Sequence, residues 1–364
     1  MNSRERILAA ARCETPDRIP VDFWAVPEVQ TRLAAALGVA EGEPLLQAVG
    51  CDVRYFRGPG FAAPEDMADG QTFTDHWGVV RQLQTVQGCR ANGEPYRWSY
   101  KHLVRSPLAD AASVADIERH AWPDPAAWDY SGVRAACENI RSAGLAVVFG
   151  GDRLDRTAQL KAAMYLRGTE NFMADMALEP AVAEALLERI AAYYLEYNRR
   201  VFEVAGGAID VFFMGDDMGT QHSLWVSKDM YRRFFKQRFA AFNELAHRYG
   251  ARTMFHTCGK VTGLVGEFVD AGLDILQSLQ PAAIGEEAAA IKRQYGHRLA
   301  FQGGIDIQNV LPKGTPADVE AHARHVAATY GPNGYIFGTA HNILPDTPTA
   351  NVVALVEAWR KYGN

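Results

Sequence analysis

The sequence lacks a hydrophobic run long enough to cross a lipid bilayer. The longest apolar runs, such as residues 145–149, fall far short of the roughly 20 residues that a membrane-spanning helix needs. The first residues contain no apolar signal core, and their acidic side chains argue against a transit peptide. These absences predict a cytoplasmic protein without membrane contacts.

Cysteine and excess positive charge are also scarce. The 364 residues include 5 Cys, an odd and scattered number that predicts no disulfide framework and fits a reducing compartment. Lys and Arg total 37 against 43 Asp and Glu, so the formal net charge is −6. A chain that is acidic and has no Lys/Arg block lacks the surface of a nucleic-acid-binding protein.

What the sequence does contain is a regular alternation of short apolar runs and helical stretches. The alternation is typical of βαβ units and a parallel sheet. We predict strands at 146–151, 209–215, 252–257, 274–279, 299–304 and 335–339. A strand at 19–23 and one unplaced strand among residues 50–100, where loops and a hairpin are also indicated, bring the number to eight. The prediction is an α/β protein, a (β/α)8 TIM-type barrel with an N-terminal helical and loop extension, forming one domain over residues 1–364.

The residues that follow these predicted strands carry unusual chemistry. Asp152, Asp216, Asp217, Gln280 and Asp306 all stand at or just after strand ends. Further candidates there are Gly304, His341 and Asn342. Because the carboxyl ends of barrel strands meet at one mouth, we expect a common pocket. An open doubly wound sheet is the rival fold, but no Gly-rich dinucleotide loop follows the first run.

His256 and Cys258 are separated by one residue at the end of a predicted strand. Alternate residues of a strand face the same side, so the imidazole and the thiol can share one ion. Zinc accepts nitrogen and thiolate ligands, and a catalytic zinc keeps one position open. The alternative is a buried thiol that packs as a small hydrophobe beside a hydrogen-bonded histidine. His341 is the candidate third ligand, with a loop-capping role or a general acid/base role as alternatives.

Asp216 and Asp217 are candidate catalytic carboxylates, together with His341. Two carboxylates held close together raise the pKa of one, as a general acid requires. In the alternative, one caps the following turn and the other binds a backbone amide. Gln280, Gly304, Asp306 and Asn342 are candidate substrate-binding residues, although Asp306 has an alternative role as the cap of the helix near residue 308.

These same residues carry a resemblance to a known family. The sequence resembles the uroporphyrinogen decarboxylase superfamily, which also contains zinc-dependent methylcobamide methyltransferases. The likeness runs through nearly the whole chain, in the motifs NSRER at 2–6, PDRIPV at 16–21, GDDMG at 215–219, HTCG at 256–259, QGGID at 302–306 and HNILPDTP at 341–348. The resemblance implies a (β/α)8 barrel and a homodimer.

Residues that differ from the decarboxylase pattern indicate which branch of the superfamily this sequence resembles more. Decarboxylases hold their porphyrin substrate with arginines after the first strand, but FWAVPE at 23–28 has none. Residues 56–59, FRGP, also lack the aspartate that the decarboxylases place there. The methyltransferase branch matches better, with His256 and Cys258 at its first two zinc ligands. Its third ligand is usually a cysteine, at the position of His341 here, and Asp216 or Asp217 is available as a fourth partner.

Three functions follow, in order of preference. The first is a zinc-dependent methyltransferase that acts on a small-molecule substrate with a corrinoid carried on a separate protein. The second is a metal-free lyase of the decarboxylase type that acts on a carboxylated substrate, with His341 and an aspartate moving protons. The third is a non-catalytic barrel that binds a small molecule or a partner.

Overall fold

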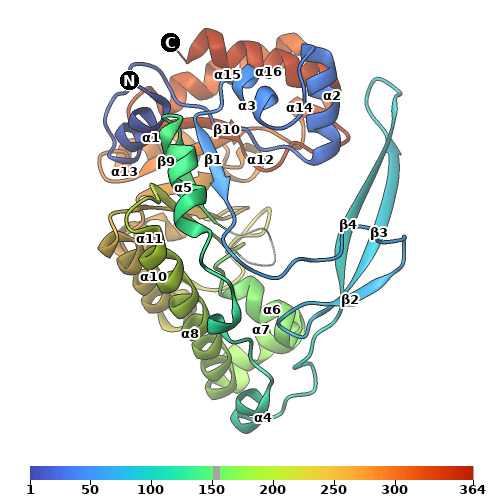
Figure 1. Ribbon diagram of the computed structural model, residues 1–364, viewed down its shortest axis with the longest axis vertical. Helices are drawn as coiled ribbons and strands as arrows, with labels where there is room; N and C mark the ends of the chain where they lie inside the picture. Colours follow the sequence, from blue (N-terminus) through green and yellow to red (C-terminus); the bar gives the residue numbers. More distant parts are fainter. Residues whose placement is uncertain (151–155, 364) are drawn as a thin grey trace.

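The computed structural model describes residues 1–150 and 156–363, and its centre is a parallel sheet that curls into a barrel (Figure 1). Neighbouring strands pair in the order β1-β5-β6-β7-β8-β9-β10. Their bounds are β1 (Val53–Phe56), β5 (Ala146–Phe149), β6 (Val211–Gly215), β7 (Arg252–His256), β8 (Ile275–Ser278), β9 (Ala300–Ile305) and β10 (Tyr335–Thr339). Each of the six predicted runs overlaps a strand, and β1 is the strand expected among residues 50–100. Asp152, predicted at a strand end, lies outside the described residues.

The segment at 19–23 closes the barrel between β10 and β1. Val21 forms a parallel bridge with Phe337 of β10, and the backbone N–H of Asp22 donates to the Phe337 carbonyl over 2.8 Å. On the other side, the N–H of Asp52 donates to the Val21 carbonyl over 2.8 Å, just before β1 begins. The eighth position is therefore filled, and the predicted TIM-type α/β barrel is confirmed.

The barrel strands are largely buried on both faces because helices cover the outside of a parallel sheet. All four residues of β5 and all five of β6 are buried. Phe149 of β5 and Phe212 of β6 stack with their ring centroids 5.6 Å apart, and Phe202 packs edge-on against both at 5.8 and 5.4 Å. Such aromatic clusters remove a large apolar area from water, and this one packs α8 (Pro180–Ala205), which carries Phe202, against the sheet.

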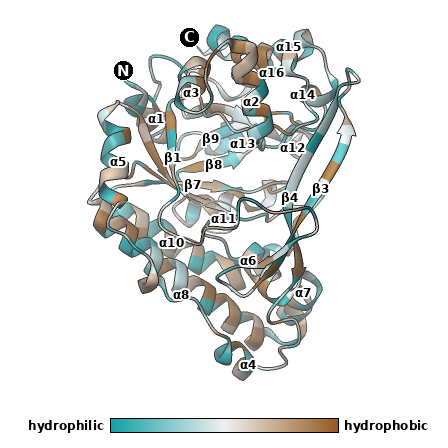
Figure 2. Cartoon of the chain, turned by 45° about the vertical axis from the view of Figure 1, so that its right-hand side comes forward, coloured by the Kyte–Doolittle hydropathy of each residue, from teal (hydrophilic) through white to brown (hydrophobic). Residues whose placement is uncertain are grey.

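Helices precede, connect and follow the strands. Asn2 and Glu5 form the capping box that starts the first helix. The longest helix, α8, begins with Pro180 and ends before the left-handed Gly206 (φ 58°), and Figure 2 shows apolar and polar bands alternating along it.

The helices are α1 (Ser3–Ala11), α2 (Pro27–Leu37), α3 (Glu43–Val49), α4 (Val114–Arg119), α5 (Val133–Ser142), α6 (Leu160–Arg167), α7 (Thr169–Leu178), α8 (Pro180–Ala205), α9 (Lys228–Tyr231), α10 (Gln237–Arg248), α11 (Val265–Asp270), α12 (Pro281–Ile284), α13 (Glu287–Tyr295), α14 (Val310–Lys313), α15 (Pro316–Tyr330) and α16 (Thr349–Tyr362). Within residues 1–150 and 156–363, no helix has the length and apolarity needed to cross a membrane.

A second, antiparallel sheet stands beside the barrel. It consists of β2 (Thr72–Thr74) and a long hairpin, β3 (Val80–Cys89) and β4 (Pro95–Arg105). Figure 1 shows the hairpin running from the level of α6 and α7 toward α2. At its tip the buried Arg90 donates to the carbonyl of Pro345 over 2.9 Å and to Glu28 Oε1 over 2.6 Å. The hairpin is thus attached to the barrel at its tip.

Candidate metal centre

The structure brings the three predicted metal ligands together at the mouth of the barrel. His256 is the last residue of β7, Cys258 follows two residues later, and His341 lies just beyond β10. One possible ligand atom from each residue lies within 4.8 Å of the other two. The Cys258 sulfur is 3.1 Å from His256 Nε2, and the two imidazole ring centroids are 5.5 Å apart. The cluster consists of two nitrogen donors and one sulfur donor.

A buried glutamine orients His256. Gln277 is aligned with His256 in the register of β8 and β7, and its Oε1 accepts a hydrogen bond from His256 Nδ1. Since the amide oxygen only accepts, the proton resides on Nδ1 and the Nε2 lone pair faces Cys258. Burial lowers the pKa of His256 well below its ordinary value, so the ring is neutral. A neutral, oriented imidazole is the form that binds a metal ion.

The charge state of Cys258 depends on whether a cation is near. Burial, reinforced by the negative charge of Asp217, raises the pKa of the Cys258 thiol to about 12. The thiol is therefore protonated near neutral pH as long as only protein groups surround it. A coordinated divalent cation deprotonates a thiol outright, so the site is suited to couple metal binding to proton release.

Asp217 supplies a carboxylate beside this cluster. Its Oδ1 lies 3.8 Å from His256 Nε2 and is buried without a hydrogen-bond partner in the described structure. Its Oδ2 accepts a hydrogen bond from Lys161. Burial opposes ionisation of Asp217, but Lys161 and the two neighbouring imidazoles together lower its pKa. A buried, ionised oxygen without a partner is unfavourable unless a cation or donor lies nearby.

Asp216 points away from the cluster and anchors the start of α6. Its Oδ2 accepts from the backbone N–H groups of Gln159 (2.7 Å) and Leu160 (2.6 Å), and its Oδ1 accepts from that of Lys161 (2.7 Å). Burial nevertheless raises the pKa of Asp216 to about 6. The two adjacent acids thus have pKa values shifted in opposite directions, and burial contributes more to the rise at Asp216 than repulsion from Asp217 does.

Asn342 is the candidate substrate-binding residue that reaches the cluster. A cavity of about 90 Å³ is lined by Asn342, His256, His341 and Asp217, together with Trp24, Arg156, Lys161 and Gly215. The Arg156 guanidinium packs over the rings of Trp24 (5.4 Å) and Phe213 (4.5 Å). A side chain at Gly215 would collide with Arg156. The cavity therefore combines two of the three possible ligands, His256 and His341, with two cationic side chains.

Gln280, Gly304 and Asp306 are absent from the described lining of this cavity. Gln280 Oε1 accepts from the N–H of Gly259 over 3.1 Å, and Gln280 Nε2 donates to Gln221 Oε1 over 3.1 Å, which ties the loop after Cys258 to a neighbouring loop. Asp306 Oδ1 accepts from the backbone N–H groups of residues 308 and 309, which matches the capping alternative.

Gly304 serves packing between elements. A Cβ there would lie 3.1 Å from Val326 and 3.2 Å from Tyr330, both on α15, so the empty position faces the helix layer. At Gly303 (φ 112°) a Cβ would collide with the carbonyl of Ser278 on β8. The two glycines allow close approach of a neighbouring strand and helix.

Two polar residues inside the barrel, Gln277 and Gln302, were not predicted to have a role at the site. Both are buried on mainly apolar strands, and a polar residue inside an apolar run is the feature of the sequence that could have identified them. Gln302 Nε2 donates to Asp22 Oδ2 over 3.1 Å, and the Tyr55 hydroxyl donates to the same oxygen over 2.6 Å. Burial raises the pKa of Asp22 to about 6. Lys161 could have been identified in the same way, because it is a charged residue in the first turn of a mainly apolar helix.

The donor set fits zinc. Two imidazoles and one thiolate are ligands that zinc accepts, and three protein ligands are typical of a catalytic site with one open position. The unpartnered Asp217 oxygen beside Nε2 would be satisfied by a cation at this place. The donor atoms and the neighbouring carboxylate of this chain are therefore compatible with a zinc ion at this place.

Known proteins resemble this chain over much of its length. Residues 106–362 match the family model described as Uroporphyrinogen decarboxylase (URO-D). The uroporphyrinogen decarboxylase of Pelodictyon phaeoclathratiforme is 27% identical over 184 residues, 49% of each chain. The methylated-thiol–coenzyme M methyltransferase of Methanosarcina mazei is 24% identical over 205 residues, 56% of this chain and 52% of the relative. The chain thus spans about half the length of the curated relatives it matches.

A solved structure supports the fold. A methyltransferase from Methanosarcina mazei superposes with a TM-score of 0.65 at 20% identity, over 100% of this chain and 99% of that one. At this level of identity the likeness concerns the fold.

Proposed function

This chain belongs to the uroporphyrinogen decarboxylase family, and we propose that it is a zinc-dependent methyltransferase. It would move a methyl group between a small substrate and a corrinoid carried by a partner protein. The observation that carries the proposal is the convergence of His256, Cys258 and His341 within 4.8 Å at the barrel mouth. The relative of M. mazei that is named a methyltransferase supports it.

Four residues would bind the zinc ion or orient its ligands. His256, Cys258 and His341 would hold the ion, and Gln277 keeps the His256 lone pair directed at it. Zinc bound there supplies a Lewis acid that makes a heteroatom of the substrate a better nucleophile or leaving group.

The neighbouring charged groups complete the site. Asp217, kept ionised by Lys161, offers a fourth partner or accepts a proton from the substrate heteroatom. Asp216 contributes by fixing the start of α6, and with it the backbone position of Lys161. Asn342, on the cavity wall, is placed to contact the substrate.

An aromatic side chain beside the proposed ligands, and the reduced state of the cysteines, are consistent with this proposal. Trp24 packs against both imidazoles, with ring centroids 5.7 Å from His256 and 6.4 Å from His341, and limits access of water to the ligands. The five cysteines have no disulfide partners, which supports a reducing compartment, and we propose the cytoplasm.

A metal-free lyase is the second candidate. It is favoured by the relatives named uroporphyrinogen decarboxylase and by two buried carboxyl groups, Asp22 and Asp216, whose pKa values burial raises to about 6. Such groups can hold a proton near neutral pH. In this alternative His341 and an aspartate would handle the proton at the carbon that loses carbon dioxide.

Zinc content separates the two proposals. Protein purified without added metal should contain close to one zinc per chain, and the double variant His256→Ala/Cys258→Ala should contain none. The matched control, Cys89→Ser/His325→Ala, changes an exposed cysteine and an exposed histidine and should retain zinc. A well-folded wild type without zinc would refute the methyltransferase proposal, and turnover with carbon dioxide release that is indifferent to chelators would establish the lyase.

A further inference from the structure

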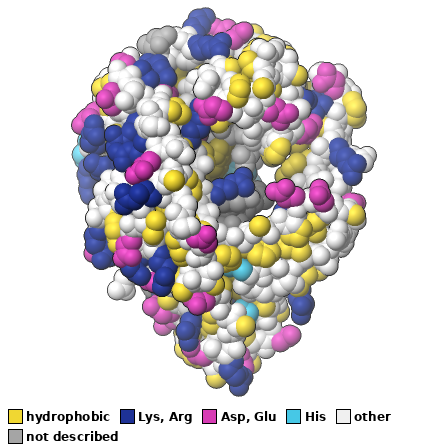
Figure 3. Space-filling model, in the orientation of Figure 1, with side chains coloured by type: hydrophobic (Ala, Val, Ile, Leu, Met, Phe, Trp, Pro, Cys, Tyr) yellow, Lys and Arg dark blue, Asp and Glu magenta, His cyan; other side chains and the backbone are white. Residues whose placement is uncertain are grey.

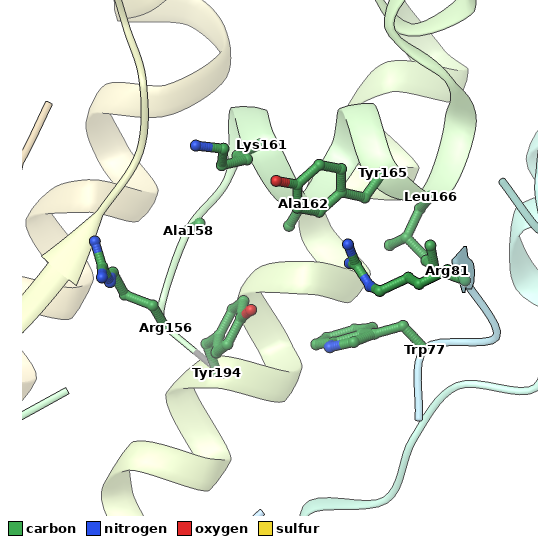
Figure 4. A pocket seen from close by; sticks show the side chains of 10 residues that line it. Trp77, Arg81, Arg156, Ala158, Lys161, Ala162, Tyr165, Leu166 and Tyr194 are labelled. Carbon is green, nitrogen blue, oxygen red and sulfur yellow. The ribbon is translucent and has the colours of Figure 1, made fainter. Parts of the chain in front are cut away.

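The two sides of the barrel mouth are built differently. The segments that follow β1 and β5 carry the hairpin and the cationic Arg156 and Lys161, whose head groups Figure 4 shows turned to the same side. Figure 3 shows Lys and Arg side chains where the surface is hollowed between the hairpin and the barrel. In the strand order β8 stands four places from β1, and β9 four places from β5, so both lie across the barrel. On that side glutamine side chains hold the loops together.

Three glutamines from the loops after β6, β8 and β9 form one hydrogen-bonded group. Gln280 Nε2 donates to Gln221 Oε1 over 3.1 Å, and Gln308 Nε2 donates to the same oxygen over 3.4 Å. Gln280 Oε1 accepts from the backbone N–H of Gly259 over 3.1 Å. Because a backbone N–H only donates, the amide oxygen of Gln280 faces Gly259 and its NH2 group faces Gln221. We call these three side chains the glutamine bridge.

The glutamine bridge ends beside the cysteine of the candidate metal centre. His256 is the last residue of β7, and its backbone is fixed by the strands on either side. Cys258 lies two residues beyond the strand, and the N–H of the next residue, Gly259, is the group that Gln280 binds. The position of the Cys258 sulfur therefore depends on the loops around it as well as on β7.

Water has no room to replace Gln280 at this place. Gly259 is buried with a left-handed backbone (φ 81°), and a Cβ there would lie 2.4 Å from the carbonyl oxygen of Thr220. The same carbonyl accepts from the N–H of Lys260 over 2.8 Å, so the loop after Cys258 packs closely against the loop after β6. A buried N–H that loses its acceptor here stays unsatisfied.

The residue before Gln280 has an unfavourable backbone conformation. Leu279 has φ 56°, a left-handed value that a bulky residue rarely adopts, and its side chain is 3% exposed. Such strain persists where the surrounding structure enforces it, and it is concentrated at functional sites. The backbone that directs Gln280 toward the cysteine loop is therefore held by packing of Leu279.

We propose that Gln280 is a positioning residue for Cys258, and that Gln221 and Gln308 keep Gln280 directed at the cysteine loop. The amide holds this loop so that the sulfur stays close to His256 Nε2, which is 3.1 Å away. Partners of this kind orient the ligands of a metal ion and raise the affinity for it. The inference rests on the proposed function for the metal ion, but the position of Cys258 can be measured without metal.

The test removes one amide and follows both the metal and the thiol. Gln280→Met keeps the length of the side chain without its acceptor or donor. It should raise the Kd for zinc about threefold to tenfold in a competition assay, since one buried hydrogen bond is lost. In metal-free protein it should speed the alkylation of Cys258 by iodoacetamide several-fold, measured by peptide mass spectrometry with the exposed Cys89 as internal reference.

The matched control is Gln82→Met. Gln82 lies on the separate sheet, where its Nε2 donates to the carbonyl of Gly70 over 2.8 Å. This variant also loses one glutamine hydrogen bond, but it should change neither the Kd for zinc nor the alkylation of Cys258.

Two further variants distinguish positioning from a simple tie between loops. Gln280→Glu keeps an oxygen for the Gly259 N–H, so Cys258 should be alkylated at close to the wild-type rate. Gln221→Met should raise the Kd for zinc less than Gln280→Met does. The double variant should raise it no more than Gln280→Met alone, because Gln221 acts through Gln280. Gln221 is only partly buried, so its variant is informative even if Gln280→Met proves unstable.

The outcomes separate the inference from the proposed function. An unchanged Kd for zinc or an unchanged alkylation rate in Gln280→Met, or effects of the two Met variants that multiply, would overturn the inference. A wild type without zinc whose Cys258 alkylation still depends on Gln280 would refute the proposed function and support the positioning role.

Discussion

Replacing Gln277 with leucine should weaken zinc binding without removing any metal ligand. Gln277 is 1% exposed and His256 is 4% exposed, so water cannot take the place of the lost acceptor. In the metal-free variant the imidazole proton can move to Nε2. In the zinc-bound form the metal occupies Nε2, so the proton must stay on Nδ1, where leucine offers no acceptor. The zinc-bound form is therefore destabilised by about 1–3 kcal/mol, the cost of an unsatisfied buried N–H.

The expected change is an increase of about 10–100-fold in the Kd for zinc, the range typical for partners of metal-bound histidines. Competition with a chromophoric chelator measures it. Gln277→Glu keeps an acceptor and should bind zinc at least as tightly as the wild type. Gln302→Leu is the matched control, because Gln302 is equally buried on the next strand but donates to Asp22. Wild-type affinity in Gln277→Leu would refute this account of how His256 is oriented.

Three other predictions concern the barrel and the hairpin. Burial raises the pKa of Asp22 from 3.8 to about 6, so its stabilisation is complete below pH 4 and is lost as the pH rises through 6. Urea unfolding of Asp22→Asn should therefore lack a decline of about 3 kcal/mol that the wild type shows between pH 4 and 7; parallel profiles would contradict this. Gly303→Ala should lower the unfolding free energy by about 3 kcal/mol or more, since a Cβ there meets the Ser278 carbonyl, and an unchanged Tm would count against it. Arg90→Ala leaves Glu28 without its buried partner and should make the hairpin several-fold more sensitive to limited proteolysis, which an unchanged cleavage rate would disprove.

Much of the fold follows from patterns within short segments. The run at 335–339 coincides with β10, and that at 252–257 exceeds β7 by one residue. These strands are short and mostly buried, and turns with Gly or Asn separate them from helices, so their local pattern locates them. The hairpin was harder, because its alternating polar and aromatic residues resemble a loop until both strands are paired.

The cluster of His256, Cys258 and His341 could be predicted because all three lie at or just after the ends of predicted strands, and barrel topology brings strand ends together. The role of Gln277 was not, since it depends on the register of β8 against β7. The two aspartates illustrate the same limit. Asp216 and Asp217 are neighbours in sequence, and only the position of α6 decides which of them faces the ligands.

Arg81 shows what non-local structure adds. It lies on the hairpin, and nothing in its local sequence relates it to the barrel mouth. Its contact with Tyr165 arises because α6 follows β5 and lies against the base of the hairpin. A contact between α6 and a separate sheet cannot be predicted from strand ends alone.

We propose that this chain holds zinc with one sulfur and two imidazole nitrogens. X-ray absorption at the zinc edge measures the ligand shell directly. The account predicts one sulfur at about 2.3 Å and two or three nitrogen or oxygen ligands at about 2.0–2.1 Å, with the sulfur absent in Cys258→Ser. A zinc shell without sulfur in the wild type, or one that Cys258→Ser leaves unchanged, would contradict it.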